Sequence, residues 1–525
     1  MPTIKTIKKL LLSLFGACSL LPTCAAQPRL VVQIVVGSMR AEDLNRYADN
    51  FRDDGFRHLA DAGTRCTSAR YDYQQTTTPV ALATLTTGAM PSTHGVIGER
   101  WQDYTTNATV RLTEGRQGPG PYLLFAPTLG ETLLRQIPGS QAVTVAAEAT
   151  SAVVAGGHTQ QVFWLDPIHC GWTTSEWYAP MLPDWIVRSN RERYNLSYLL
   201  PEWRTIYERN RYRNTRHSEI ILAERFRRDR DMAGNRRRGP QSDYEQLLTT
   251  PAGNSAVLGF AKQLIAQYGL GADETPDLLT VCLDTPRRIA ETYGPESVEV
   301  EDMYYRLDCD LADFLTFVFA QVRHGEALVI LTSDHGTSPS YDAGAVPAER
   351  FNARQFEVIV GGFLNVRYGT GAWVTACDDK SIWLNHNLIY ERGLDLADVQ
   401  NEVAIFAMQF GGVSHALAAT AMRTSYFGSG YARRMQNSFY PRRSGDVVLN
   451  LMPGWIEERP GCVSLSGSMY GYDTEVPLIF YGMGIGAQRI DRHVDMTSVA
   501  PTIARLLGIS EPAASEGDPI TEITE

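Results

Sequence analysis

The sequence LVVQIVVGSMR occupies residues 30–40 and decides the fold. Its first seven residues, Leu30 to Val36, are apolar except for one glutamine, a pattern typical of a strand buried on both faces. Three later runs rich in Val, Ile and Leu have the same character: Leu278 to Leu283, Ala327 to Thr332 and Val476 to Tyr481. We interpret all four as strands of one sheet that helices cover on both sides.

Helical patterns lie between these strands, at Tyr304 to Val322 and at Met496 to Leu507. The alternation predicts an α/β fold with a doubly wound, mostly parallel central sheet. In such sheets ligands bind at the carboxyl ends of the strands. Gly37, Arg287 and Asp334 each follow a predicted strand directly or lie just beyond one, so we expect them to converge on one crevice.

The length and composition limit the architecture. With 525 residues, of which 44% are hydrophobic, the chain can bury a large core. We interpret residues 27–525 as one α/β domain with a cap insertion at about 164–240 and a second insertion at about 347–461. The net charge of −11 argues against general nucleic-acid binding.

The N-terminal segment predicts export. Residues 1–26 contain three lysines, an apolar run over residues 10–21 and a small-residue end suited to signal-peptidase cleavage after Ala26. We expect a periplasmic protein; a lipid anchor on Cys18 or Cys24 is the alternative. The apolar run is shorter than the roughly 20 residues of a spanning helix, and no later run is long enough, so we expect no transmembrane segment in the mature chain.

Six cysteines remain after the predicted signal peptide. An exported protein can form disulfides, but six cysteines allow 15 pairings and the sequence does not choose among them. They are Cys66, Cys170, Cys282, Cys309, Cys377 and Cys462.

Four short segments carry a family resemblance. They are VVGSMR at residues 35–40, TPRRIAE at 285–291, SDHG at 333–336 and YDTEVP at 472–477. In this order they resemble the metal-binding segments of the periplasmic phosphate-irrepressible alkaline phosphatases. These enzymes form a branch of the alkaline phosphatase superfamily that also includes nucleotide pyrophosphatases and phosphodiesterases. The resemblance covers nearly the whole mature chain and implies a two-zinc active site under a cap, here residues 164–240.

The resemblance implies that one zinc is held by two Asp and one His. The matching positions here are Gly37, Asp334 and His335, and glycine has no ligand atom. Because a catalytic zinc needs three protein ligands and an open position, the two residual ligands would bind weakly. Asp334 and His335 either retain this weak metal binding or are held only by hydrogen bonds.

The second zinc would be held by one Asp and two His, and those positions read Arg287, Glu291 and Glu475. A guanidinium keeps its proton and cannot coordinate a cation. We predict that Arg287 lies inside the pocket as a substitute for the zinc. Its expected partners are Glu291, Glu475 and Asp334, through charge-assisted hydrogen bonds.

The phosphate-binding positions that the resemblance implies have changed too. Glu99, Glu148 and Thr150 stand where the family has Asn, Lys and Arg, so we expect an acidic pocket that repels phosphate. Thr78 occupies the nucleophile position. The same segment is also an ordinary helix start, with Thr78 as N-cap and Pro79 at the first helical position.

An arginine-rich stretch lies in the predicted cap. Residues 188–238 contain 15 arginines and seven acidic residues. This local excess of positive charge is either a solvated, self-paired surface or a binding surface for an anionic partner, such as an envelope protein.

Together these features predict an exported alkaline phosphatase-like pseudoenzyme. It would have lost two-zinc phosphoryl transfer and would act by binding, as an envelope-complex subunit or a ligand receptor, with no cofactor. The alternative is an active phosphomonoesterase or phosphodiesterase that uses Thr78 as nucleophile. Its non-standard site would hold one divalent cation, Zn²⁺, Mg²⁺, Ca²⁺ or Mn²⁺, and would require Arg287 to point away from the pocket.

Overall fold

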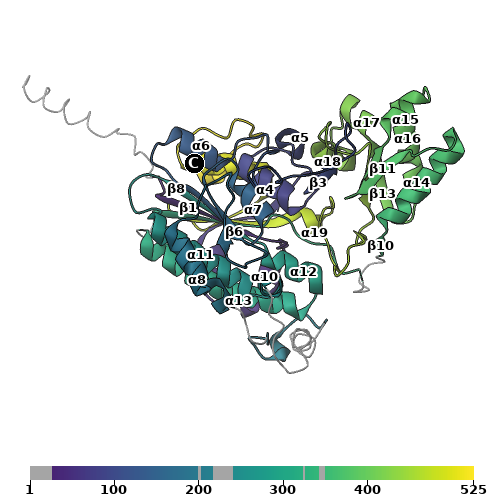
Figure 1. The fold of residues 1–525 in the computed structure, drawn as a ribbon. Coiled ribbons are helices and arrows are strands. Elements are labelled where there is room, and N and C mark those ends of the chain that lie inside the picture. The colour runs from purple at the N-terminus through teal and green to yellow at the C-terminus, as the bar shows by residue number, and fades with distance from the viewer. Residues whose placement is uncertain (1–26, 199–202, 217–239, 323–325, 342–348) are drawn as a thin grey trace, which may run out of the picture.

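The computed structural model describes residues 27–198, 203–216, 240–322, 326–341 and 349–525 (Figure 1). The predicted signal peptide, with Cys18 and Cys24, lies outside the described residues. The central feature is a nine-stranded sheet with the order β17-β2-β16-β9-β1-β8-β5-β6-β7. Its strands are β1 (Leu30–Val36), β2 (Thr64–Arg70), β5 (Ala142–Ala146), β6 (Gln161–Leu165), β7 (Trp172–Thr173), β8 (Asp277–Leu283), β9 (Ala327–Thr332), β16 (Glu475–Gly482) and β17 (Gln488–Asp495).

The predicted doubly wound, mostly parallel sheet is confirmed. β1 pairs in parallel with both β8 and β9, with Leu30 opposite Asp277 and Ala327, and β5 continues the parallel order to β6. β16 differs from this pattern, because it runs antiparallel to β9. Its first residue, Glu475, rather than its last, therefore lies at the edge where the parallel strands end.

The two faces of the sheet bury two separate cores. Leu30, Val32 and Ile34 of β1 join the core on one face, whereas Val31 and Val35 join the core on the other. This alternation is the period-two geometry of a strand, applied to a strand covered on both sides.

The helices are divided between the two faces (Figure 1). The first core is covered by α3 (Phe56–Ala62), α8 (Asp184–Glu192), α10 (Pro240–Leu248), α11 (Ala252–Tyr268), α12 (Thr285–Tyr293) and α13 (Val298–Gln321). The second is covered by α4 (Thr78–Thr87), α6 (Leu129–Gln136), α7 (Ala149–Gly156), α20 (Val499–Leu506) and α21 (Thr521–Thr524). Short elements connect them: α2 (Asp43–Arg46), η1 (Ala48–Asn50), α5 (Pro91–His94), β3 (Arg100–Gln102), β4 (Thr109–Arg111), η2 (Tyr194–Tyr198), η3 (Arg209–Arg211), α19 (Gly471–Thr474) and η4 (Met496–Ser498).

Two predicted helices have different beginnings. α13 starts at Val298, six residues before the predicted Tyr304, because the Ser297 side chain accepts a hydrogen bond from the Val300 backbone N–H and caps it. The second predicted helix begins as the 3₁₀ turn η4 and becomes α-helical at Val499.

Most of the second predicted insertion forms a lobe with its own sheet and core, at the right of Figure 1. Its elements are β10 (Arg350–Phe351), α14 (Ala353–Tyr368), β11 (Val374–Asp378), β12 (Ser381–Leu384), α15 (His386–Glu391), α16 (Leu396–Ala407), β13 (Val413–Ala418), α17 (Ala419–Thr424), α18 (Gly430–Ser438), β14 (Val447–Leu451) and β15 (Ile456–Glu457). β10 enters the lobe, β15 leaves it, and the two pair in parallel. This pairing brings the lobe's two connections together beside the central domain.

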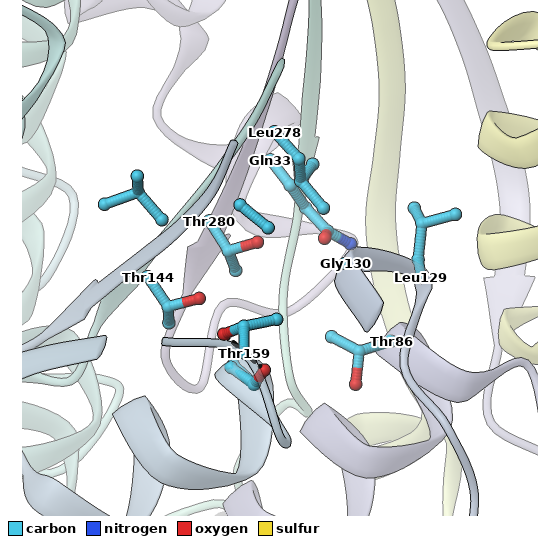
Figure 2. A pocket seen from close by; sticks show the side chains of 12 residues that line it. Gln33, Thr86, Leu129, Gly130, Thr144, Thr159, Leu278 and Thr280 are labelled. Atoms are coloured by element: carbon cyan, nitrogen blue, oxygen red, sulfur yellow. Dashed lines mark hydrogen bonds between the residues drawn. The ribbon is translucent and has the colours of Figure 1, made fainter. Parts of the chain in front are cut away.

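A small cavity lined by both polar and apolar side chains lies inside the second core (Figure 2). It measures about 10 Å³ and is lined by Gln33 of β1, Thr86 of α4 and the strand residues Thr144 and Thr280. This is about the space of one water molecule, so the cavity is a packing feature and not a ligand site. Among the helices that the structure describes, none combines the length and hydropathy that a membrane crossing requires.

Candidate functional site

The predicted site residues gather where the parallel strands end. Arg287 belongs to α12, which starts just after β8, and Asp334 follows β9. Gly37 follows β1 and its N–H donates to the Leu283 carbonyl (2.9 Å). The ideal Cβ position of Gly37 lies 3.1 Å from the Arg287 Cβ and 2.9 Å from the Leu283 oxygen, so any side chain would crowd the start of α12. The segments of these three residues therefore lie close together, as predicted, but of the three only Arg287 lines the cleft described below.

One part of the site is an ion-pair group that we call the arginine cluster, consisting of Glu148, Arg287 and Glu291. Arg287 Nη1 donates to Glu291 Oε1 at 3.1 Å, one helical turn along α12, and Nη2 donates to Glu148 at the start of α7. The Arg287 side chain is only 13% exposed. Both acidic partners therefore hold a cation that is largely removed from solvent.

Electrostatics within the arginine cluster are dominated by burial and by these contacts. Burial disfavours the charged form of Arg287, but Glu148, Glu291 and Asp284 outweigh it and hold the pKa of Arg287 well above its ordinary value. Burial raises the pKa of the Glu148 carboxyl to about 7, and Arg287 opposes that rise. A permanent cation thus stabilises carboxylates that would otherwise be costly to bury.

The expected partners of Arg287 were partly wrong. Glu291 is a partner, but Glu475 is exposed at the start of β16, and no described ion pair joins it to Arg287. Asp334 instead accepts hydrogen bonds from the Thr78 hydroxyl and from the Ser38 and His335 backbone N–H groups. Glu148, the second partner, was not expected. The resemblance implied only that Glu148 replaces a phosphate-binding lysine.

The other part of the site, which we call the threonine cluster, consists of Thr78, Asp334 and His335. Thr78 Oγ1 donates to Asp334 Oδ2 at 2.7 Å and lies 3.1 Å from His335 Nε2. Asp334 Oδ1 accepts from the Ser38 and His335 backbone N–H groups at 2.9 and 2.8 Å. Ser38 adopts a left-handed conformation with φ of 57°, a backbone strain that this contact helps to hold.

The threonine cluster is almost entirely enclosed. Asp334 and His335 are 2% and 1% exposed and Thr78 is 7% exposed. His335 Nδ1 lies 2.6 Å from the Gly336 carbonyl oxygen, a contact that requires a proton on Nδ1 and leaves Nε2 as the only ring nitrogen able to ligate. The N-cap prediction was wrong: Thr77 is the N-cap of α4, without a side-chain capping bond, and the Thr78 hydroxyl bonds across to Asp334 instead.

The residues present do not fit the two-zinc group that the resemblance implies. A zinc site needs three protein ligands, whereas the threonine cluster offers Asp334, His335 and a hydroxyl already bonded to Asp334. The arginine cluster has a cation at an expected ligand position. Across the described ranges, no three His, Cys, Asp or Glu side chains gather closely enough to hold a metal ion.

The arginine cluster and Thr78 of the threonine cluster border a cleft of about 890 Å³ between the central domain and the second lobe, whereas Asp334 and His335 do not line it. The central domain contributes Thr78 and six charged residues: Glu99, Arg100, Glu148, Arg287, Arg288 and Glu291. The second lobe and its exit segment contribute seven more: Arg354, Glu357, Asp378, Asp379, Glu457, Glu458 and Arg459. The sequence had not indicated the lobe's contribution, although the charged runs 378–380 and 457–459 could have suggested it.

The predicted cap insertion is described only in part, without residues 199–202 and 217–239, so its position over the site stays a prediction. None of the described residues of 164–240 lines the cleft. Instead this segment packs along α13: the Trp203 indole Nε1 donates to Asp302 at 2.7 Å, and the Asn214 N–H donates to Glu301 at 2.7 Å. Thr150 of α7 is also absent from the lining, whereas Glu99 and Glu148 are part of it.

Several arginines of the stretch 188–238 contact neighbouring groups. Arg193 pairs with Asp243 at 3.3 Å, Arg213 pairs with Asp49, and Arg211 donates to the Asn50 side chain at 3.0 Å. These partners lie outside the stretch, so the contacts attach it to neighbouring elements and do not decide between the two interpretations. Residues 217–238 lie outside the described residues, so binding of an anionic partner by this stretch stays a prediction.

The six cysteines of the predicted mature chain are free thiols in this structure. Cys377 and Cys462 both line the cleft, and the other four lie elsewhere.

Comparison with known proteins agrees with this architecture. The chain belongs to the type I phosphodiesterase / nucleotide pyrophosphatase family, whose model matches residues 31–472, and so to the alkaline phosphatase superfamily. It is 28% identical to a protein named calcium-transporting ATPase from Myroides odoratus, over 95% of each chain. It is 27% identical to alkaline phosphatase PafA from Elizabethkingia meningoseptica, over 95% of this chain and 94% of PafA.

The crystal structure of wild-type PafA is similar to the present structure. The TM-score is 0.85 at 26% identity, and the match covers 95% of this chain and 99% of that chain. The sequence resemblance is confirmed at the level of family and fold. The metal and phosphate-binding positions inferred from it stay predictions.

Proposed function

We propose that this protein is an exported binding protein built on the phosphodiesterase fold, a pseudoenzyme that has lost two-zinc phosphoryl transfer. Its ligand site is the cleft between the central domain and the second lobe. The observation that carries the proposal is the arginine cluster, in which Arg287 lies within the cleft and is held by Glu148 and Glu291.

The charge of the cleft supports the loss of phosphoryl transfer. A phosphate group entering it would meet Glu99 and Glu148, at positions where the resemblance implies Asn and Lys. Arg287 could attract the phosphate, but both of its ion-pair partners among the described residues are carboxylates that already neutralise it. Electrostatic stabilisation of the transition state is usually the largest catalytic term, and this cleft lacks its usual sources.

The Thr78 hydroxyl also fits a structural role. A threonine becomes a nucleophile when a metal or a base activates it. Here the hydroxyl donates a hydrogen bond to the Asp334 carboxylate, which also accepts hydrogen bonds from the Ser38 and His335 backbone N–H groups. Thr78 therefore helps to hold the ends of β1, β9 and α4 together.

The competing function is a hydrolase with a non-standard metal site. It requires Arg287 to leave the cleft so that a divalent cation can reach Glu291, Glu475 and Asp334. The exposure of Glu475 at the start of β16 and the two ion pairs of Arg287 favour the binding protein over this alternative.

The test is purification from the envelope without chelator, followed by metal analysis and assays with aryl phosphate monoesters and diesters. We expect no stoichiometric metal and no turnover above that of the Thr78→Ala variant. Two zinc ions per chain, or turnover that Thr78→Ala abolishes, would falsify the proposal. The mass of the purified chain reports at the same time whether residues 1–26 have been removed.

A further inference from the structure

The cleft has more acidic than basic side chains, and its basic ones are largely neutralised. Eight carboxylates and five arginines line it. Arg100 makes two hydrogen bonds to Asp378, of 2.5 and 2.8 Å, and Arg287 is held within the arginine cluster. Arg288 contacts Glu245 at 3.4 Å and Arg459 lies 3.8 Å from Asp379. Only Arg354, exposed at the start of α14, has no carboxylate within ion-pair distance among the described residues.

Carboxylates remain on both walls after these pairs are formed. Glu99 on the central domain and Glu357 on α14 have no cation within ion-pair distance among the described residues. Glu457, at the end of β15, is the most notable, because its Oε2 atom is buried and has no hydrogen-bond partner in the described structure. A buried carboxylate oxygen without a donor is costly, so a cationic donor entering the cleft would be stabilised there.

The arrangement favours an extended organic cation over a metal ion. The acidic side chains are spread along two walls, and within the described residues they form no metal-ligating group of three. A chain with several ammonium groups can instead reach separate carboxylates at once.

We propose that the cleft binds a flexible organic polycation, whose alkylammonium groups pair with Glu457 and Glu357 on the lobe and with Glu99 on the central domain. This inference rests on the proposed function, because it assigns a ligand class to the same cleft. Two sources offer this chemistry, a free polyamine or the lysine side chains of a peptide.

The experiment is calorimetric titration of the full mature chain with spermine and, separately, with trilysine. We expect saturable binding that Glu457→Gln weakens by about tenfold or more and that Glu357→Gln also weakens. Because Glu357 is partly exposed, its variant keeps the test valid if Glu457→Gln perturbs folding. The control is Glu391→Gln, an exposed carboxylate of the same lobe outside the cleft, which we expect to leave the affinity unchanged.

The possible results separate clearly. Tighter binding of spermine assigns the site to a free polyamine, and tighter binding of trilysine assigns it to a basic peptide. Absence of binding, or equal weakening by Glu391→Gln and Glu457→Gln, overturns the inference, because the attraction would then be absent or only reflect net charge. If neither spermine nor trilysine binds, and the protein contains no zinc and shows no turnover, only the proposed ligand class is rejected. If the protein shows zinc-dependent turnover, the proposed function itself is rejected.

Discussion

The arginine cluster and the threonine cluster lie at the same edge of one sheet, yet they are built differently. The threonine cluster keeps Asp334 and His335, and its Asp334 is satisfied by a hydroxyl and backbone N–H groups. The arginine cluster satisfies its carboxylates with a guanidinium. One part can therefore be held together without any buried cation, and the other cannot.

This difference shows how a strand edge that gathers carboxylates can remain stable without metal. Burying a carboxylate costs several kcal/mol unless it is paired or fully hydrogen-bonded. Glu148 and Glu291 both pair with Arg287, which lies between them. Asp334 is instead held by hydrogen bonds from uncharged groups such as the Thr78 hydroxyl. The arginine cluster should accordingly be the more sensitive of the two to loss of a single residue.

The largest expected effect is that of Arg287→Asp, which replaces the cation with a third carboxylate. We expect a loss of about 3 to 5 kcal/mol in the free energy of unfolding, because Glu148 and Glu291 would then repel each other and the new side chain. Thermal and urea unfolding measure it. The matched control is Arg288→Asp, at the neighbouring and more exposed position. We expect it to lower the free energy of unfolding much less. An unchanged or higher midpoint for Arg287→Asp in metal-free buffer would contradict the cation role.

The second prediction concerns Asp473, a carboxyl beside the threonine cluster. It is 1% exposed, and burial raises its pKa from the ordinary 3.8 to about 6. The folded state therefore holds this proton more tightly than the unfolded state does. Its contribution to stability is complete below pH 3.8 and is lost as the pH rises through about 6.

Asp473→Asn removes this titration while keeping an oxygen that can accept from Ser468. We expect the stability of the variant relative to the wild type to rise by up to about 3 kcal/mol between roughly pH 4 and pH 7. Unfolding midpoints of the two proteins across that range measure the difference. A constant difference across the range would show that Asp473 is ionised throughout and that a cation near the threonine cluster has been overlooked.

The smallest expected effect is that of Thr78→Val, which removes the hydroxyl that bonds Asp334. We expect a loss of about 1 to 2 kcal/mol, the usual cost of leaving a buried acceptor without its donor. Thr78→Ser keeps the hydroxyl and should retain most of the stability. If Val and Ser variants unfold alike, the hydrogen bond to Asp334 contributes little, and the two clusters differ less than we infer.

The core strands could be predicted closely because their residues are apolar on both faces. β1 and β9 have the predicted bounds, and β8 begins only one residue early. The direction of β16 could not be predicted in the same way, because a buried run is equally apolar whether it runs parallel or antiparallel. The antiparallel direction of β16 brings Glu475 to the edge where Arg287 lies, but the Glu475 side chain is exposed there and forms no described ion pair with Arg287.

The sequence predicted which residues form the site better than it predicted the contacts among them. Sequence position alone indicated that Gly37, Arg287 and Asp334 meet, because strand ends share an edge. It did not indicate that Glu148 would reach Arg287, since that contact depends on how α7 and α12 start beside each other. The second lobe's share in the cleft depends likewise on the pairing of β10 with β15, which are separated by about a hundred residues.

From the sequence we could derive the doubly wound fold, the family and a guanidinium at position 287, shortly after β8. These follow from local composition and short motifs, which are written in consecutive residues. The tertiary structure was needed to show that Glu148 pairs with Arg287, that Thr78 donates a hydrogen bond to Asp334, and that the second lobe lines the cleft. Those contacts join segments far apart in the chain, and their geometry is set by packing across the sheet edge, which no local pattern encodes.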